Sequence, residues 1–144
     1  MKPFPELEAL LEDKFDGIVT MVFEPRACDG KTWDVVDSFV SAHGFRPLHN
    51  RWNLIDEATA IAMISEMLHR SLAYSVEMMS EKTAAHCAEA FRELFDRFSI
   101  TCVSNGYINA DGMGWTPITD STFEMAVAIY DANNIGMICV EDED

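Results

Sequence analysis

The last thirty residues contain the clearest strand pattern in the chain, and they constrain its fold more than any other segment. From residue 123 to 130, two sets of residues alternate with the period of two that is typical of a half-buried strand. The apolar set is Phe123, Met125, Val127 and Ile129, and the other set is Glu124, Ala126, Ala128 and Tyr130. A second β-rich run, Ile135 to Val140, follows the turn residues 131–134. We therefore predict an antiparallel hairpin that buries the apolar set and carries the acidic residues after Val140 to one edge.

The remaining patterns predict both helices and strands within one domain. The chain has 144 residues, 49% of them apolar, which is enough to form a hydrophobic core. Helical patterns cover residues 5–15, 32–43, 56–79 and 80–98, and short β-rich runs cover 18–23 and 100–103. This order predicts a single α+β domain over residues 1–144. We expect a mainly antiparallel sheet with a C-terminal β-hairpin, and helices packed on one face.

Three segments have less distinct patterns. Residues 72–78 alternate as a strand would, but they also continue the preceding helical period, which favours a helix to residue 79. Asn105-Gly106 favours a tight type I′ turn, with Tyr107 and Ile108 as the return strand. The pattern of residues 45–54 indicates either an irregular crossing segment or a short strand.

The charge of the chain is strongly negative. Lys and Arg total 10 against 25 Asp and Glu, for a formal net charge of −15. Arg97 is the last basic residue, and eight acidic residues follow it. The C-terminal third is therefore expected to be an unneutralised negative field. Such a surface repels nucleic acid and attracts a basic partner, although a run of charge also serves simply as a solubilising tail.

No spacing in the chain indicates catalysis, a metal or a cofactor. The four cysteines have no CxxC pair, and the four histidines have no HxH or HExxH spacing. The one candidate for a nucleophile–base pair in the predicted loops is Cys28 with His43 or His49. The simpler interpretation is that Cys28 is a loop thiol without a role. Without a leader or an apolar run near ~20 residues, we expect a cytoplasmic protein with reduced thiols and no membrane contact.

Several short motifs resemble a family of small acidic bacterial proteins. The C-terminal part has the pattern WxPITxxTF, from Trp115 to Phe123, and closes on VEDED, from Val140 to Asp144. Leu72-Ala73-Tyr74 and Asn105-Gly106 precede it in the corresponding order. Proteins of this kind resemble immunity proteins of bacterial toxin systems. The resemblance implies a non-enzymatic protein that neutralises a cognate toxin by covering its basic surface, for example that of a nuclease.

On this hypothesis the binding surface consists of acidic residues of the C-terminal third with two aromatic anchors. The predicted partner-binding residues are Tyr107, Trp115, Asp120, Glu124, Asp131, Glu141, Asp142, Glu143 and Asp144. A different hypothesis is a small enzyme or ligand-binding subunit whose anion pocket lies near Arg46, His49, Arg51 and Trp52, which form the basic patch of the chain. A structural homo-oligomer without a ligand is a third possibility.

Overall fold

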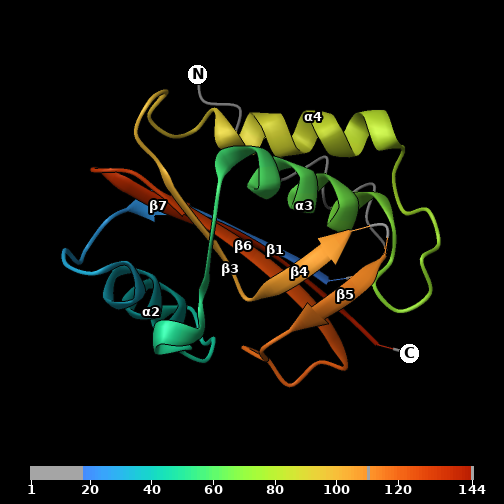
Figure 1. Ribbon diagram of the computed structural model, residues 1–144, viewed down its shortest axis with the longest axis horizontal. Helices are drawn as coiled ribbons and strands as arrows, with labels where there is room; N and C mark the ends of the chain where they lie inside the picture. Colours follow the sequence, from blue (N-terminus) through green and yellow to red (C-terminus); the bar gives the residue numbers. More distant parts are fainter. Residues whose placement is uncertain (1–17, 110, 144) are drawn as a thin grey trace.

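The computed structural model describes residues 18–109 and 111–143. Within them, a five-stranded antiparallel sheet has the order β1-β7-β6-β3-β2, and β4 and β5 form a separate two-stranded sheet (Figure 1). The elements are β1 (Ile18–Pro25), α2 (Thr32–Ala42), the 3-10 helix η1 (His49–Arg51), β2 (Asn53–Ile55), α3 (Glu57–His69), α4 (Glu81–Arg92), β3 (Thr101–Ser104), β4 (Gly106–Asn109), β5 (Gly112–Trp115), β6 (Phe123–Tyr130) and β7 (Asn134–Asp142). The predicted α+β class with a mainly antiparallel sheet is confirmed.

The predicted C-terminal hairpin forms the centre of the sheet. β6 pairs antiparallel with β7, from Tyr130 opposite Ile135 at the turn to Phe123 opposite Asp142 at the open end. Met125, Val127 and Ile129 are buried as expected, and Phe123 is half-buried. The second set of residues is buried as well, from Glu124 to Tyr130. The expectation of a half-buried strand is therefore wrong, because β6 lies between two strands and under helices on both sides.

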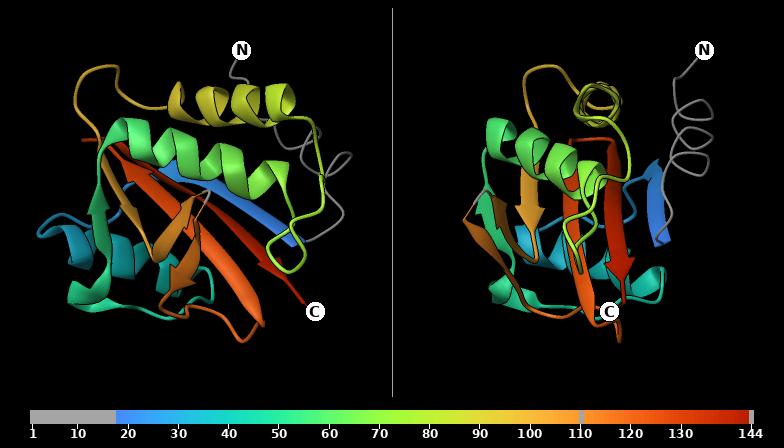
Figure 2. Two further views of the ribbon diagram at one scale, coloured as in Figure 1. Left: turned by 45° about the vertical axis from the view of Figure 1, so that its right-hand side comes forward. Right: turned by 90° about the vertical axis from the view of Figure 1, so that its right-hand side faces the viewer.

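Helices cover both faces of the sheet, and the prediction that they pack on one face is wrong (Figure 2). One hydrophobic cluster joins α3 and α4 to the face of β6 that carries Met125, Val127 and Ile129. A second cluster joins α2 to the opposite face, which carries Ala126 and Ala128. Because side chains alternate along a strand, two apolar faces on one strand require two covering layers.

The predicted helix from residue 56 to 79 is shorter than expected. Asp56 caps its start by accepting a hydrogen bond from the Thr59 N–H at 2.7 Å, but α3 ends at His69. The segment after it is neither a helix nor a regular strand. The Ser71 hydroxyl accepts hydrogen bonds from two backbone N–H groups of this segment, so it offers the chain an alternative to the helical hydrogen bonds.

Asn105-Gly106 does not form the predicted hairpin turn. Both residues are buried, and β4 pairs with β5 instead of returning along β3. The Asn105 side chain accepts a hydrogen bond from the Ala126 N–H at 2.8 Å and so binds this corner to β6. A Cβ atom on Gly106 would lie 2.0 Å from the Gly114 carbonyl oxygen. Glycine is required here by close backbone packing rather than by a tight turn.

The other sequence predictions have mixed outcomes. The strand at 18–23 and the helix at 32–43 correspond to β1 and α2, and residues 45–54 contain η1 and β2. The helix that starts after Ser80 ends at Arg92 rather than near residue 98. The predicted helix over residues 5–15 lies outside the described residues. No helix in the described part of the chain is long and apolar enough to cross a membrane.

Candidate functional site

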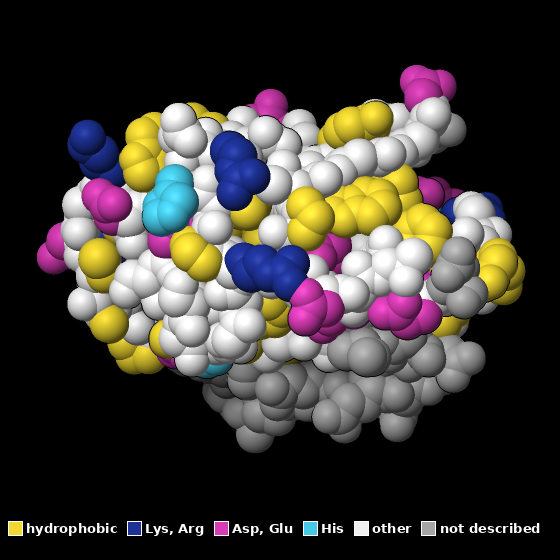
Figure 3. Space-filling model, turned by 90° about the horizontal axis from the view of Figure 1, so that it is seen from below, with side chains coloured by type: hydrophobic (Ala, Val, Ile, Leu, Met, Phe, Trp, Pro, Cys, Tyr) yellow, Lys and Arg dark blue, Asp and Glu magenta, His cyan; other side chains and the backbone are white. Residues whose placement is uncertain are grey.

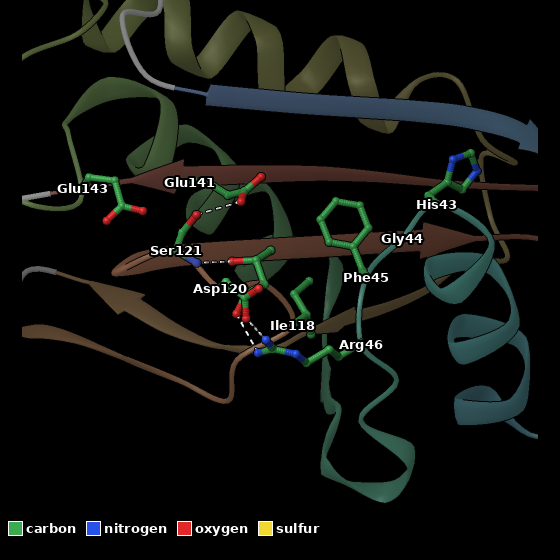
Figure 4. A pocket seen from close by; sticks show the side chains of 10 residues that line it. His43, Gly44, Phe45, Arg46, Ile118, Asp120, Ser121, Glu141 and Glu143 are labelled. Carbon is green, nitrogen blue, oxygen red and sulfur yellow. Dashed lines mark hydrogen bonds and ion pairs between the residues drawn. The ribbon is translucent and has the colours of Figure 1, made fainter.

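A groove of about 520 Å³ lies at the open end of the β6–β7 hairpin. One wall is the connection from α2 to η1, and the other is the connection from β5 to β6 together with the end of β7. The lining residues are His43, Gly44, Phe45, Arg46, Ile118, Thr119, Asp120, Ser121, Glu141 and Glu143. The Phe45 ring lies between the His43 end and the Ser121–Glu141 pair (Figure 4). The groove therefore combines an apolar surface with carboxylates at one end.

Glu124 fixes one wall of this groove from inside the protein. Its side chain is fully buried, and one carboxylate oxygen accepts hydrogen bonds from the Ile118 N–H at 2.7 Å and the Asn105 amide at 2.8 Å. The other oxygen accepts from the Thr119 N–H at 2.9 Å and the Thr119 hydroxyl at 2.6 Å. The prediction that Glu124 belongs to the binding surface is wrong, because these donors hold it in the core. It is a residue that positions Asp120 and Ser121.

Asp131 is also absent from the surface, and it lies at the opposite end of the hairpin. Its carboxylate accepts hydrogen bonds from the N–H groups of Asn133, Asn134 and Asp96 at 2.7–2.8 Å. Burial opposes ionisation of Asp131, but these backbone donors and the Arg26 guanidinium outweigh it and lower its pKa. Asp131 therefore caps the hairpin turn and does not present a free carboxylate on the surface where partner binding was predicted.

The acidic run at the C-terminus is divided between the two faces of the sheet. Glu141 accepts a hydrogen bond from the Ser121 hydroxyl at 2.8 Å, and Glu143 binds the Thr122 hydroxyl and N–H. Both side chains line the groove. The Asp142 carboxylate instead accepts from the Ala73 N–H at 3.1 Å, on the side of α3. The expectation that these carboxylates share one edge is wrong, because successive side chains along a strand point to opposite faces of the sheet. Asp144 lies outside the described residues.

Hydrogen bonds from Thr122 keep Glu143 ionised. The hydroxyl of Thr122 contributes most and its backbone N–H contributes next, and together they lower the pKa of Glu143 below its usual value. Because Glu143 is exposed, this carboxylate is a charged group that a partner can reach.

Glu124 and Glu141 lie directly opposite each other on β6 and β7. Directly opposed side chains on neighbouring strands share one face of the sheet, and like charges in this position are destabilising. Among the ion pairs of the described residues, none joins a basic side chain to either glutamate. The groove therefore contains a half-buried carboxylate, Glu141, beside a buried one, and its arginine, Arg46, pairs with Asp120 instead of with either glutamate.

The surface around the groove is not the uniform negative field expected from the sequence. Arg46 pairs with Asp120, and His43 pairs with Glu24 at 2.7 Å. The underside of the molecule shows acidic, basic and apolar side chains close together (Figure 3). Arg46, from the first half of the chain, thus pairs with an acidic residue of the C-terminal third, which a count along the sequence cannot reveal.

The two predicted aromatic anchors lie on the small β4–β5 sheet and not in the groove. Trp115 is half-buried and packs against Phe123, with ring centroids 5.8 Å apart. Tyr107 is 54% exposed and lies opposite Gly114. A Cβ atom on Gly114 would lie 2.8 Å from the Tyr107 ring. Tyr107 thus covers the glycine of the neighbouring strand, and Trp115 closes one end of the core.

Two members of the basic patch of the alternative hypothesis, Arg46 and His49, pair with carboxylates. Besides Arg46 with Asp120, His49 lies 3.1 Å from Asp37. The Asp37 carboxylate also accepts hydrogen bonds from the Trp52 indole at 2.7 Å and from two backbone N–H groups. Arg51 bonds the Leu48 carbonyl oxygen at 3.4 Å. Asp37 and its donors stabilise the turn around η1, whereas Arg51 is exposed and has no carboxylate partner among the ion pairs of the described residues.

Two further chemical features concern thiols and metals. Cys28 contacts the carbonyl oxygens of Asp29 and Asp34, while His43 and His49 pair with carboxylates. Burial raises the pKa of the Cys102 thiol to about 11, so this thiol stays protonated at neutral pH. The described residues contain no group of three or more His, Cys, Asp and Glu side chains arranged to hold a metal ion.

Comparison of the chain with family models, with curated proteins and with solved structures finds no match. The resemblance to small acidic bacterial proteins therefore stays a prediction. Sequence reasoning missed Phe45 and Ser121, which help to complete the groove, and considered His43 only as a base for Cys28. No local pattern identifies them, because the groove forms only where the α2–η1 connection meets the β5–β6 connection.

Proposed function

We propose that this protein is a non-enzymatic binding protein that docks a basic protein at the open end of the β6–β7 hairpin. The observation that carries the proposal is the pair of opposed carboxylates, Glu124 and Glu141, without a cation among the described ion pairs. A Lys or Arg side chain of a partner that reaches Glu141 relieves the repulsion between them. Binding then gains more than a surface ion pair normally contributes.

The groove suits the side chain of such a partner. Lys and Arg have an apolar stem and a charged end, and here Phe45 offers an apolar surface while Glu141 and Glu143 supply the charge. The net charge of −15 adds long-range attraction, which raises association rates at low salt. Both features favour a basic protein over a nucleic acid as the ligand.

Within this class we infer that the partner is a toxin and that the protein acts as its immunity protein in the cytoplasm. A nuclease toxin must be positively charged where it binds phosphate, so an acidic protein competes well for that surface. The four free cysteines fit a reducing compartment. The motif resemblance described above supports the same assignment.

The groove is tested first with a simple probe, a hexa-arginine peptide, in an NMR titration of the 15N-labelled protein. We expect the amide signals of Ser121, Glu141 and Glu143 to shift, and the affinity to fall with added salt as the Debye length shortens from ~10 Å at 0.1 M to ~3 Å at 1 M. A hexaglutamate peptide serves as the negative control.

A matched pair of variants then tests the location. E141Q/E143Q removes two charges from the groove, and E81Q/E89Q removes two exposed charges from α4. Peptide binding should weaken several-fold in the first variant and change little in the second. Equal weakening in both, or shifts spread evenly over the protein, contradicts the proposal, because net charge alone then explains binding.

The toxin assignment needs a cellular test. The product of the neighbouring gene is expressed with and without this protein, and growth is measured together with association kinetics at two salt concentrations. Replacement of Glu141, Asp142, Glu143 and Asp144 by Gln and Asn should slow association more than it accelerates dissociation. If the neighbouring product is harmless to cells, or if the neutral variant protects fully, the immunity assignment fails.

A further inference from the structure

The loop between α3 and α4 presents two exposed apolar side chains beside the acidic end of β7. Tyr74 is 66% exposed and Val76 is 58% exposed. The Ala73 N–H, next to Tyr74, donates to the Asp142 carboxylate at 3.1 Å. Figures 1 and 2 both show the yellow-green loop close to the C-terminal end of β7. Tyr74 and Val76 form an apolar tip on this loop. The tip and the acidic groove therefore lie at the same end of β7, on opposite faces of the sheet.

Hydrogen bonds hold this tip in one conformation. The Ser71 hydroxyl accepts from the N–H groups of Tyr74 at 3.4 Å and of Val76 at 3.1 Å. The Ser71 N–H donates to the Val76 carbonyl oxygen at 2.8 Å, and the Arg70 guanidinium donates to the Ser75 carbonyl oxygen at 3.2 Å. A tip that is ordered before binding loses less entropy when a partner docks.

Both ends of the loop are fixed to the core. Leu72 and Met79 are buried in the cluster under α3 and α4, and His69 bonds the Met79 carbonyl oxygen at 2.8 Å. Ser75, between the two exposed residues, has a φ of 57°. This left-handed conformation is unfavourable for residues other than glycine, and such positions cluster at binding sites.

We propose that Tyr74 and Val76 are the apolar anchor of the interface whose charged half is the groove. The inference rests on the proposed function and defines its partner further, as a basic protein that carries an apolar side chain next to its Lys or Arg residues. Tyrosine is enriched among the residues that dominate binding energy at interfaces. A hollow of about 250 Å³ between this loop and the β4–β5 hairpin leaves room for a side chain of the partner.

Two peptides separate the two halves of the interface. Each has six arginines and a Gly-Ser-Gly linker, and one ends in Trp-Leu while the other ends in Ser-Ser. The wild-type protein should bind the Trp-Leu peptide at least about fivefold more tightly, because an aromatic contact adds to the electrostatic binding. The measurement is isothermal titration calorimetry at fixed salt, with NMR shifts of the Tyr74 and Val76 amides as the local readout.

Variants of the protein test whether the preference for the Trp-Leu peptide comes from Tyr74 and Val76. In Y74S/V76S the preference for the Trp-Leu peptide should fall to about one while the affinity for the Ser-Ser peptide is retained. The matched control is F98S, since Phe98 is another exposed aromatic residue, 89% exposed, in the loop after α4. It should leave the preference unchanged.

The outcomes distinguish the two proposals. If both peptides bind the wild-type protein equally, or if Y74S/V76S retains the preference, the apolar anchor is refuted while the groove stands. If F98S abolishes the preference as fully as Y74S/V76S, the effect is general hydrophobicity and the anchor is also refuted. If neither peptide binds, the proposed function fails and the anchor fails with it.

Discussion

At the turn end of the β6–β7 hairpin, the Asp131 carboxylate is buried and bonded to three backbone N–H groups. At the open end, Glu141 is bonded to one hydroxyl and Glu143 to one residue of the neighbouring loop, and a partner can reach both. The same type of side chain therefore caps a turn at one end and remains available for binding at the other. The difference arises from the number of backbone donors nearby, which the charge of the sequence does not report.

Glu124 tests this comparison most strongly, because it is a buried carboxylate at the open end. E124A should destabilise the protein by about 3 kcal/mol, since the N–H groups of Ile118 and Thr119 lose their acceptor. The free energy of unfolding is measured by urea denaturation. E124Q keeps one acceptor oxygen and should lose about half as much. A loss below about 1 kcal/mol for E124A would mean that water replaces the carboxylate, and the groove wall would not depend on it.

At the turn end, D131A should destabilise the protein by about 2 kcal/mol, because the donors of residues 96, 133 and 134 lose their acceptor. D131N retains the oxygen that Asn133 and Asn134 share, and its loss should be smaller. The other carboxylate oxygen, which accepts from the Asp96 N–H, is replaced in D131N, and hydrogen exchange of the Asp96 amide measures the loss of that bond. If this amide is as well protected in D131N as in the wild type, the bond contributes nothing.

The pH dependence of stability should follow Asp131 as well. Its pKa is lower in the folded protein than its ordinary value of 3.8, so its contribution is fully present above 3.8. This contribution is lost as the pH falls through the folded pKa. The stability difference between wild type and D131N should therefore shrink on acidification below about pH 4. Denaturation at several pH values measures it, and a constant difference down to about pH 2 would assign the effect to packing.

The smallest effect is expected from Glu141, opposite Glu124. E141Q should stabilise the protein by up to about 0.5 kcal/mol at low salt, because it removes one of two opposed charges and still accepts from Ser121. The gain should shrink at ~1 M salt, although the burial of Glu124 limits the screening. A loss of stability at low salt would show that the two carboxylates do not repel each other, and the proposed function would lose its main support.

Residue patterns along the chain were enough to predict the hairpin and the strands and helices with clear periods. β6 and β7 lie where alternation placed them, and Asp56 and Ser80 cap α3 and α4 through local hydrogen bonds. These features depend on residues close together in the chain. Residues 72–78 fit both a helical and a strand period, so the sequence left their structure ambiguous. In the structure the Ser71 hydroxyl accepts hydrogen bonds from backbone N–H groups of this segment, in place of the carbonyl oxygens of a helix.

Contacts between distant parts of the chain determine which acidic residues face solvent. Glu124 and Glu141 are separated along the chain and directly opposed in the sheet, and their surroundings depend on a loop that neither residue belongs to. The corner at Asn105-Gly106 was wrongly predicted for the same reason, since its hydrogen bonds reach β6 and the residue after β5. Hydrogen-bond donors distant in the chain determine whether a carboxylate is stabilised inside the protein or remains in water, and no local pattern records them.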